Sequence, residues 1–431
     1  MMKIIEANSK AGKEYMEFVK KRAEEVQNDV NIVVDKILAD VRINGDEAII
    51  EYTQKYDSKF VTTDNLVVTK EEIENAYKMV DQNFLDAIKL AKNNVMEFHE
   101  KQKKDPWRMT KDKGVILGQI VRGLDSVGIY VPGGTAAYPS TVIMNSVPAK
   151  VAGVKNLVMT TPPLADGSVN PYILVAADIA GVDKIYKVGG AQAIAGLAFG
   201  TETISKVDKI VGPGNIYVAM AKKSVFGFVD IDMIAGPSEI LIIADGAANE
   251  KFIAADLMSQ AEHDVLASAM LITTSRQLAE KVAKELEHQI KGMSRKDIIE
   301  KSLEKYGVML IVQNIKEAID LANKIAPEHL EIMLKNPLDY LGDIKNAGSI
   351  FLGDYSPEPL GDYIAGPNHV LPTSGTARFF SPLSVDDFIK KSSYICYTKE
   401  ALSEVADKVI VLTEVEGLTA HGNSIKVRVQ S

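Results

Sequence analysis

The feature that most restricts the fold of this chain is an alternation of short apolar runs with alanine-rich stretches, which begins at Val127. The short apolar runs favour buried strands, and the longer stretches between them have helical spacing. Strands that alternate with helices at this interval predict parallel βαβ units. The expected strands are residues 127–131, 156–160, 184–188 and 209–212, and the expected helices are 138–153, 171–181, 191–200 and 215–226.

A second set of the same kind follows. Its expected strands are residues 239–245, 268–274, 307–312 and 348–352, and its expected helices are 249–263, 276–291 and 315–325. Asn314 is followed three residues later by Glu317, which predicts a capping box at the start of the last helix. The chain is therefore expected to be an α/β protein with two modules.

The segment before Val127 is rich in Lys, Glu and Ala, with apolar residues at helical spacing. It predicts helices over 11–55 and 70–104, with a break at Gly45 and a short strand near 66–68. We expect the second module to be completed by this helical part. The predicted division is an N-terminal helical arm (1–30), a discontinuous domain (31–128 with 239–382), a second domain (129–238) and a C-terminal arm (383–431).

The composition excludes several classes of protein. The formal net charge of −9 argues against nucleic-acid binding, which needs a clustered basic surface. One cysteine, Cys396, excludes an intrachain disulfide and a thiolate metal cluster. No apolar run is long enough to predict a membrane span, and the N-terminus has no signal-peptide core. We expect a cytoplasmic protein that binds neither nucleic acid nor membrane.

Histidine is scarce, and its neighbours point to candidate sites. Of the six histidines, His99 and His288 lie in charged amphipathic stretches, where we expect exposed side chains. Gln260 and His263 are three residues apart at the end of an expected helix, so they share one face and can ligate one ion. The alternative is a polar helix end with a histidine favoured by the helix dipole. The HExxH motif of zinc proteases is absent from the sequence.

The adjacent pair Glu328 and His329 follows Pro327, which permits a helix to begin there. We expect the pair at a helix start, where a histidine and a glutamate suit proton transfer. An ordinary Glu-His dipeptide without a catalytic role is the alternative.

Two later segments carry further candidates. Residues 357–379 combine Asp362, Tyr363 and His369 with several glycines and prolines, which predicts a loop of fixed geometry, either a site or a structural Ω-loop. Glu416 and His421 lie in the expected C-terminal arm. They are either plain tail residues or part of a site, which such an arm reaches more easily on a second subunit.

Glycine-containing loops at 131–140 and 212–219 follow strands and precede helices, where backbone N–H groups can meet a phosphate. Neither matches the dinucleotide fingerprint, because Tyr217 stands where the third glycine would be. A nucleotide is therefore compatible with these loops but not specified by them. Ser238 follows a Gly-Pro turn and is either a site residue or part of a simple turn.

Seven motifs together resemble those of the histidinol dehydrogenase family, in order and at similar distances, over about residues 35–428. They are VPGGTAAYPSTVIMNSVPAKVAGV, GPGNIYVA, IDMIAGPSEI, DLMSQAEHD, IAPEHLE, LGDYIAGPNHVLPTSGTARF and EGLTAH. The resemblance implies two incomplete Rossmann-like modules, NAD and zinc as cofactors, and a homodimer with a shared active site. Incomplete modules of this kind also explain the missing glycine fingerprint.

The resemblance also implies roles for individual residues. The zinc ligands, one ion per subunit, would be Gln260, His263, Asp362 and His421, with His421 contributed by the partner subunit. Glu328 and His329 would be the catalytic acid–base pair. The substrate would contact Ser238 and Glu416 as well as Gln260, His263, His329, Asp362 and His421, with His369 as a further candidate. NAD would contact Tyr130, Gln192 and Asn215.

The implied reaction is the oxidation of L-histidinol to L-histidine through L-histidinaldehyde, by two hydride transfers to NAD, in the last steps of histidine biosynthesis. Two alternatives stay open. The same fold can act on another polar alcohol, because fold and chemistry do not specify the substrate. A non-catalytic metal- or nucleotide-binding protein is the other, and the intact Glu328–His329 pair argues against it.

Overall fold

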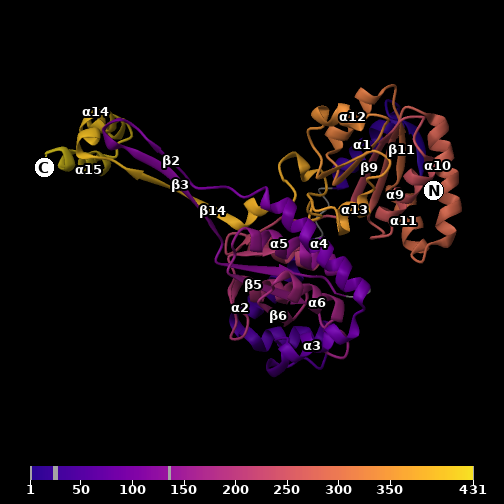
Figure 1. Cartoon of the computed structure of the whole chain (residues 1–431), viewed down its shortest axis with the longest axis horizontal. Coiled ribbons are helices and arrows are strands. Elements are labelled where there is room, and N and C mark those ends of the chain that lie inside the picture. Colours follow the sequence, from indigo (N-terminus) through magenta and orange to yellow (C-terminus); the bar gives the residue numbers. More distant parts are fainter. Residues whose placement is uncertain (1, 23–27, 134–136, 431) are drawn as a thin grey trace. The chain divides into compact units, whose positions relative to one another are not determined.

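The computed structural model describes residues 2–22, 28–133 and 137–430. The chain divides into two compact units (Figure 1). The large unit consists of Met1–Gln102 and Leu124–Phe388, and the small unit of Lys103–Gly123 and Ile389–Ser431. Of the expected loop 131–140, residues 134–136 lie outside the described residues. No helix in the described ranges combines the length and the apolar character that a membrane crossing requires.

The first module of the large unit is built on a parallel sheet with the strand order β6-β5-β4-β7-β8. The strands are β4 (Ser126–Tyr130), β5 (Asn156–Thr161), β6 (Lys184–Lys187), β7 (Lys209–Val211) and β8 (Asp230–Ile231). The helices between them are α5 (Pro139–Val151), α6 (Pro171–Ala180), α7 (Gly190–Phe199) and α8 (Ile216–Val225). These elements confirm the predicted alternation. The strand order reverses between β4 and β7, and the carboxyl ends of strands at such a reversal form a crevice that binds ligands.

The second module repeats this topology on a parallel sheet with the order β1-β11-β10-β9-β12-β13. Its strands are β1 (Lys3–Glu6), β9 (Glu239–Ala244), β10 (Ser268–Thr273), β11 (Val308–Ile311), β12 (His329–Met333) and β13 (Ser349–Leu352). Its helices are α1 (Lys10–Arg22), α9 (Glu250–Ala261), α10 (Arg276–Gln289), α11 (Lys296–Tyr306), α12 (Ile315–Ile325) and α13 (Glu358–Tyr363). Residues 1–30 are therefore not only a helical arm, because β1 forms the edge of this sheet.

Strand β12 corrects the expectation of a helix start at Glu328–His329. Helix α12 ends at Ile325, and the residue that caps it, Ala326, adopts the left-handed conformation with φ 55°. Pro327 follows and disfavours any helical continuation at Ala326. His329 then begins a buried strand between β9 and β13. The pair therefore enters the centre of a sheet.

The N-terminal helices correct the predicted domain division. They are α2 (Asn28–Tyr56), α3 (Lys70–Met79) and α4 (Gln82–Glu100), and α2 is kinked at Gly45 as predicted. Helix α2 packs on α7 and α8, and α3 and α4 pack on α6 and α5. Their apolar side chains thus share the hydrophobic cores of the first module. Residues 31–100 therefore supply the layer that buries the faces of the sheet of residues 126–231, whereas the prediction grouped them only with 239–382.

Short elements complete the large unit. The strand expected near 66–68 is reduced to one bridge, between Val67 and Tyr186. The 3-10 helices of the chain are Thr63–Asn65, Asp112–Gly114, Ile290–Gly292, Pro337–Asp343, Thr376–Arg378 and Val385–Phe388. Only one of the two hydrogen bonds of the predicted capping box forms at the start of α12. The Asn314 side chain accepts the N–H of Glu317, but the Glu317 side chain accepts the N–H of Gln313 in place of that of Asn314.

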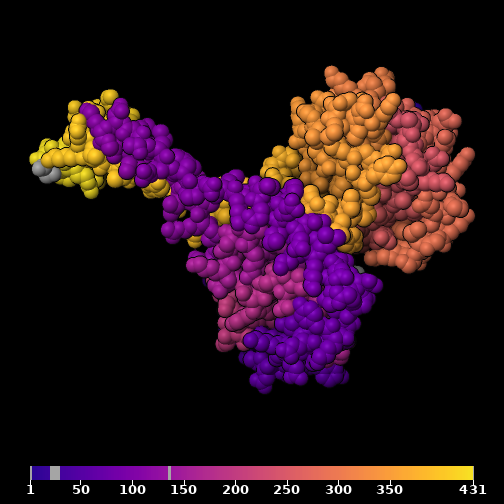
Figure 2. Space-filling view, in the orientation of Figure 1, coloured from indigo at the N-terminus to yellow at the C-terminus, as the bar shows by residue number. Residues whose placement is uncertain are grey.

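The small unit is an antiparallel sheet with the order β14-β3-β2, followed by two helices. The elements are β2 (Trp107–Thr110), β3 (Ile116–Gly123), β14 (Ile389–Cys396), α14 (Lys399–Val415) and α15 (Thr419–Gln430). β14 pairs with the whole length of β3, and the two segments form one body (Figure 2). The C-terminal arm expected at 383–431 therefore includes 103–123. Its first residues, up to Phe388, belong to the large unit.

Candidate active site

Two neighbouring cavities lie at the carboxyl ends of β4 and β7. The first has a volume of about 630 Å³ and is lined by the ends of β4 and α2 and the start of α7. The second has a volume of about 340 Å³ and adds the amino ends of β9 and β12, the end of α9 and the loop around α13. Pro132 and Asn215 line both cavities. Ligands in the two cavities would therefore meet at the strand-order reversal of the first sheet.

Glu328 and His329 are held in the second cavity by the main chain of one residue, Glu239. The Glu239 N–H donates to Glu328 Oε2 at 2.7 Å. The Glu239 carbonyl lies 2.9 Å from His329 Nδ1. β9 and β12 are paired strands, with His329 opposite Ile240, so the register of the sheet brings both side chains to the same main-chain residue.

The contact with a carbonyl determines which ring nitrogen of His329 can act as a base. A carbonyl oxygen only accepts hydrogen bonds, so Nδ1 carries the hydrogen and Nε2 is the acceptor of the neutral ring. Nε2 has no hydrogen-bond partner among the described residues and lies 3.8 Å from Glu358 Oε1 and 3.9 Å from Asp362 Oδ1. Burial lowers the pKa of His329, although the charge of Asp362 opposes this effect. The ring is therefore a neutral base whose free nitrogen faces the carboxylates.

Glu328 is suited to a different proton-transfer role. Burial raises its pKa well above the usual range of a glutamate, and the Glu239 N–H opposes this only in part. A carboxylate with a raised pKa is a stronger base once ionised, and general bases work best when their pKa lies near the working pH. Glu328 and His329 therefore form a pair of bases in one buried pocket.

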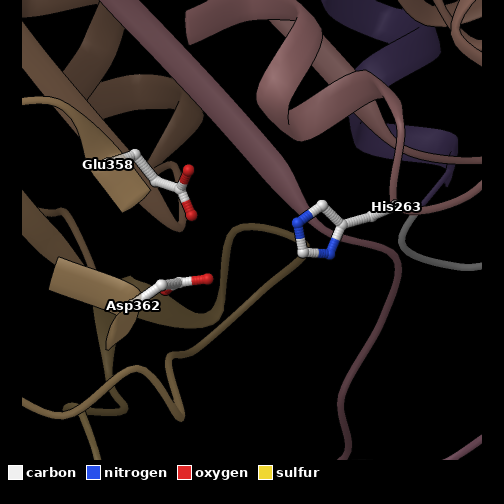
Figure 3. Close-up of side chains that lie close together, drawn as sticks. All are labelled: His263, Glu358 and Asp362. Atoms are coloured by element: carbon white, nitrogen blue, oxygen red, sulfur yellow. The ribbon is translucent and has the colours of Figure 1, made fainter. Parts of the chain in front are cut away.

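A metal-binding cluster lies beside His329. Potential ligand atoms of His263, Glu358 and Asp362 all lie within 4.8 Å of one another. Figure 3 shows the two carboxylates of α13 directed toward the imidazole of His263. Gln260, on the last turn of α9, is 1% exposed, and neither polar atom of its amide has a hydrogen-bond partner in the described structure. An unpartnered buried amide is costly, and an ion held by these side chains would satisfy its oxygen Oε1.

Glu358 was not among the sequence-predicted site residues. Burial and the nearby charge of Asp362 raise the pKa of Glu358 to about 10. The carboxylates of Glu358 and Asp362 therefore repel each other unless they share a proton or a cation. Its main-chain N–H donates to Glu331 Oε1 at 2.8 Å. Glu331 lies two residues after His329 on β12, so the two side chains share one face of the strand. Glu331 thus orients α13 against β12. The one sequence signal for Glu358 was its place in a Pro-Glu-Pro motif, which precedes the predicted Asp362.

The remaining predicted residues divide between the two units. Ser238 and His369 line the second cavity, and His369 Nδ1 lies 3.0 Å from the Asp362 carbonyl. Glu416 and His421 are exposed residues of the small unit, at the end of α14 and in α15. They are not among the residues that line the second cavity.

The three predicted cofactor contacts, Tyr130, Gln192 and Asn215, all line the first cavity. The Tyr130 hydroxyl accepts the Gly190 N–H at 3.1 Å. Asn215 caps α8 by accepting the N–H groups of Tyr217 and Val218 at 3.0 and 3.2 Å, which leaves its NH₂ group as a donor.

Asp57 also lines the first cavity and was missed. Burial raises its pKa to about 6, while the main chain of Gly189 opposes the shift. One of its carboxylate oxygens is buried without a hydrogen-bond partner in the described part of the chain. It was missed because its surroundings are assembled from α2 and the start of α7, which are distant in sequence.

The expectation for His99 was wrong, whereas His288 is exposed as predicted. His99 is fully buried, with Nδ1 2.7 Å from the Val95 carbonyl. Its Nε2 lies 3.4 Å from the amide nitrogen of Asn368, the residue before His369. His99 thus supports the loop that carries His369. Its helical spacing from the buried Ala91 and Val95 was the signal that could have placed it on the buried face.

Known proteins match this chain over nearly its whole length. A family model described as "Histidinol dehydrogenase" matches residues 20–429. The chain is 63% identical to the histidinol dehydrogenase of Clostridium acetobutylicum, over 99% of both chains. It is 58% identical to that of Caldanaerobacter subterraneus, over 92% of this chain and 91% of the relative. The chain belongs to the histidinol dehydrogenase family.

A solved structure agrees with this membership. The crystal structure of histidinol dehydrogenase from Elizabethkingia anophelis superposes with a TM-score of 0.94, at 39% identity, over 100% of this chain and 98% of that chain. The predicted α/β fold and the predicted membership of the histidinol dehydrogenase family are thereby confirmed, and the protein is an enzyme of the dehydrogenase type.

Proposed function

We propose that this histidinol dehydrogenase oxidises L-histidinol to L-histidine through L-histidinaldehyde, with NAD as hydride acceptor and one zinc ion per subunit. The observation that carries the proposal is that two buried bases, Glu328 and His329, share one cavity with a metal-binding cluster. That cavity adjoins the one that contains the predicted cofactor contacts. The proposed activity completes histidine biosynthesis, and we assign it to the cytoplasm.

His329 performs the proton transfer of the first oxidation. The alcohol of the substrate donates its proton to Nε2, the ring nitrogen that lacks a partner in the described structure. The hydrogen bond from Nδ1 to Glu239 then stabilises the imidazolium that forms. NAD, when bound, supplies the hydride acceptor for both oxidations.

Glu328 acts in the second oxidation. Its carboxylate takes a proton from the water molecule that attacks the aldehyde carbon, and this attack provides the second oxygen of the product carboxylate. The Glu239 N–H holds one carboxylate oxygen in place, which leaves the other to orient the water. Both side chains are buried, so the aldehyde is protected from bulk solvent between the two steps.

Gln260, His263 and Asp362 fit a zinc site, with His421 of a second copy as the fourth ligand. The nitrogen and oxygen donors of this set are compatible with zinc, and the unpartnered amide of Gln260 is explained by such a role. When bound, the ion would orient the amine and imidazole of the substrate, which Ser238, and Glu416 of the second copy, would also contact. Glu358, inside the same cluster, balances the charge of the site.

Tyr130, Gln192 and Asn215 would bind NAD in the first cavity. These side chains offer a hydroxyl and two amides at the reversal of strand order, which is where α/β sheets bind nucleotides. The proposal does not need the glycine fingerprint, because the pocket is lined by residues from five separate segments of the chain.

The surface of the small unit supports a homodimer. In its described part the buried apolar residues are Val115, Ala401 and Ala406, too few for an independent core. Large apolar side chains are exposed instead, namely Trp107, Met109, Ile120, Ile395, Tyr397, Val411, Leu412, Val415, Leu418 and Val427. Exposed apolar surface of this kind marks protein–protein interfaces. A second copy of the chain is the partner we propose for it.

Substitution of the two catalytic side chains separates the two oxidations. We expect His329→Asn to lower kcat for L-histidinol by about 10²- to 10⁴-fold, the usual range for a lost general base. Glu328→Gln should slow the conversion of L-histidinaldehyde more than that of L-histidinol. His288→Asn and Glu262→Gln are the matched controls, and stopped-flow measurement of NADH formation is the readout. Unchanged turnover by folded variants at both positions would show that this assignment is wrong.

Substitution of a ligand tests the metal site without turnover. We expect Asp362→Asn to bind zinc at least about 10- to 100-fold more weakly, because an anionic ligand is lost. Glu262→Gln, a neighbouring carboxylate outside the cluster, should bind zinc like the unmodified chain. Zinc content after dialysis, measured by mass spectrometry, is the readout. Equal zinc in both variants argues against the proposed ligand set.

Mixed dimers test the shared site. A dimer of one His421→Ala chain and one His329→Asn chain keeps a single complete site. Random mixing makes half of the dimers mixed, so we expect about a quarter of the unmodified activity from two inactive parents. Differently tagged chains allow the mixed dimer to be purified. Its inactivity would refute a site completed by His421 of the other chain.

A further inference from the structure

A buried ion pair in the wall of the second cavity has no role in the reaction described above. Lys222 lies on α8 and Asp232 directly follows β8, and their side chains are only 3% and 1% exposed. They form a salt bridge and both line the second cavity. Charged side chains are almost never fully buried unless paired, and such pairs add little net stability. The pair therefore calls for an explanation other than stabilisation of the fold.

Two further hydrogen bonds join this pair to Gly212, just after β7 ends, and a third fixes the carboxylate of Asp232. The Gly212 N–H donates to Asp232 Oδ2 at 2.8 Å. Lys222 Nζ donates to the Gly212 carbonyl at 2.9 Å. The N–H of Met233 donates to the other oxygen of Asp232 at 2.6 Å. Both main-chain groups of Gly212 are thus held by one neutral pair of charges.

Gly212 is the start of a tightly confined loop. Its φ of 111° lies in the region that favours glycine, and a Cβ atom there would lie 2.1 Å from the Tyr130 carbonyl. The loop continues through Pro213 and Gly214 to Asn215, which lines both cavities. Asn215 and Tyr130 are predicted cofactor contacts that lie on either side of the strand-order reversal. The contacts that hold Gly212 in place therefore also set the position of Asn215 relative to Tyr130.

We propose that Lys222 and Asp232 are positioning residues for the cofactor: they clamp the Gly212–Asn215 loop so that Asn215 and Tyr130 can bind NAD together. The inference rests on the proposed function, since it assumes that the first cavity binds the nucleotide. The clamp contributes by pre-organising the loop, because a loop held in its bound geometry avoids the ordering cost of binding.

The neighbouring strands provide a matched control. Lys209 on β7 is also buried and pairs with Asp230 on β8 at 2.9 Å. Neither residue lines either of the two cavities. Lys209→Met therefore removes a buried lysine of the same sheet without reaching the cofactor loop.

The experiment compares NADH binding, measured by its fluorescence, in the full-length dimer. The test variant carries Lys222→Met with Asp232→Asn, so that no unpaired charge is left buried. We expect its Kd for NADH to rise about tenfold, equivalent to about 1.4 kcal/mol, while its zinc content stays unchanged. A rescue variant carries Lys222→Gln with Asp232→Asn and should recover most of the affinity, because the glutamine amide can still donate to the Gly212 carbonyl. In turnover, KM should rise for NAD and not for L-histidinol.

The outcomes distinguish the two proposals. The clamp is supported if NADH affinity falls tenfold in the methionine variant, recovers in the glutamine variant and does not fall in Lys209→Met. Unchanged NADH affinity in the methionine variant overturns the clamp but not the cofactor assignment. A loss of NADH affinity in Lys209→Met equal to that in the methionine variant has the same consequence. Failure of the unmodified chain to bind NADH overturns the cofactor assignment and the clamp with it. If the methionine variant does not fold, Asp232→Asn alone takes its place. A weaker NADH affinity in Asp232→Asn than in the glutamine variant supports the clamp, and equal affinities in the two overturn it.

Discussion

The geometry of the proposed active site depends on one pair of hydrogen bonds, made by the main chain of Glu239 to Glu328 and His329. Because a backbone N–H and a backbone C=O have opposite polarity, one residue can hold a carboxylate by one group and an imidazole by the other. The pairing of β9 with β12 places both groups correctly. The tautomer of His329, and with it the ring nitrogen that is left to accept a proton, follows from this register.

The two modules share a strand order but present opposite ends of their sheets to the site. The first module follows the common rule for α/β proteins and uses the carboxyl ends of β4 and β7. The second uses the amino ends of β9 and β12, with His329 as the first residue of its strand. Side chains at strand ends are held by the sheet, which suits a site whose bases must keep their orientation through two successive oxidations.

The sequence predicted much of the fold, since the alternation of apolar runs located most strands of both sheets. It could not assign the N-terminal helices to a module, because amphipathic spacing reveals a buried face and not the surface that covers it. The same limit applies at the site. Gln260 and His263 were recognisable by helical spacing, whereas Glu358 and Asp57 depend on neighbours that only the folded chain supplies. The helix expected at His329 was wrong because pairing with β9 and β13 outweighs local preference.

The central claim is that one site carries out both oxidations. The most direct test is the ratio of NADH formed to L-histidine formed by the purified, zinc-loaded protein supplied with L-histidinol. We predict two NADH per histidine, with activity lost on chelation and restored by zinc. Release of L-histidinaldehyde with a single NADH, or no turnover by a folded and zinc-loaded dimer, would contradict the account.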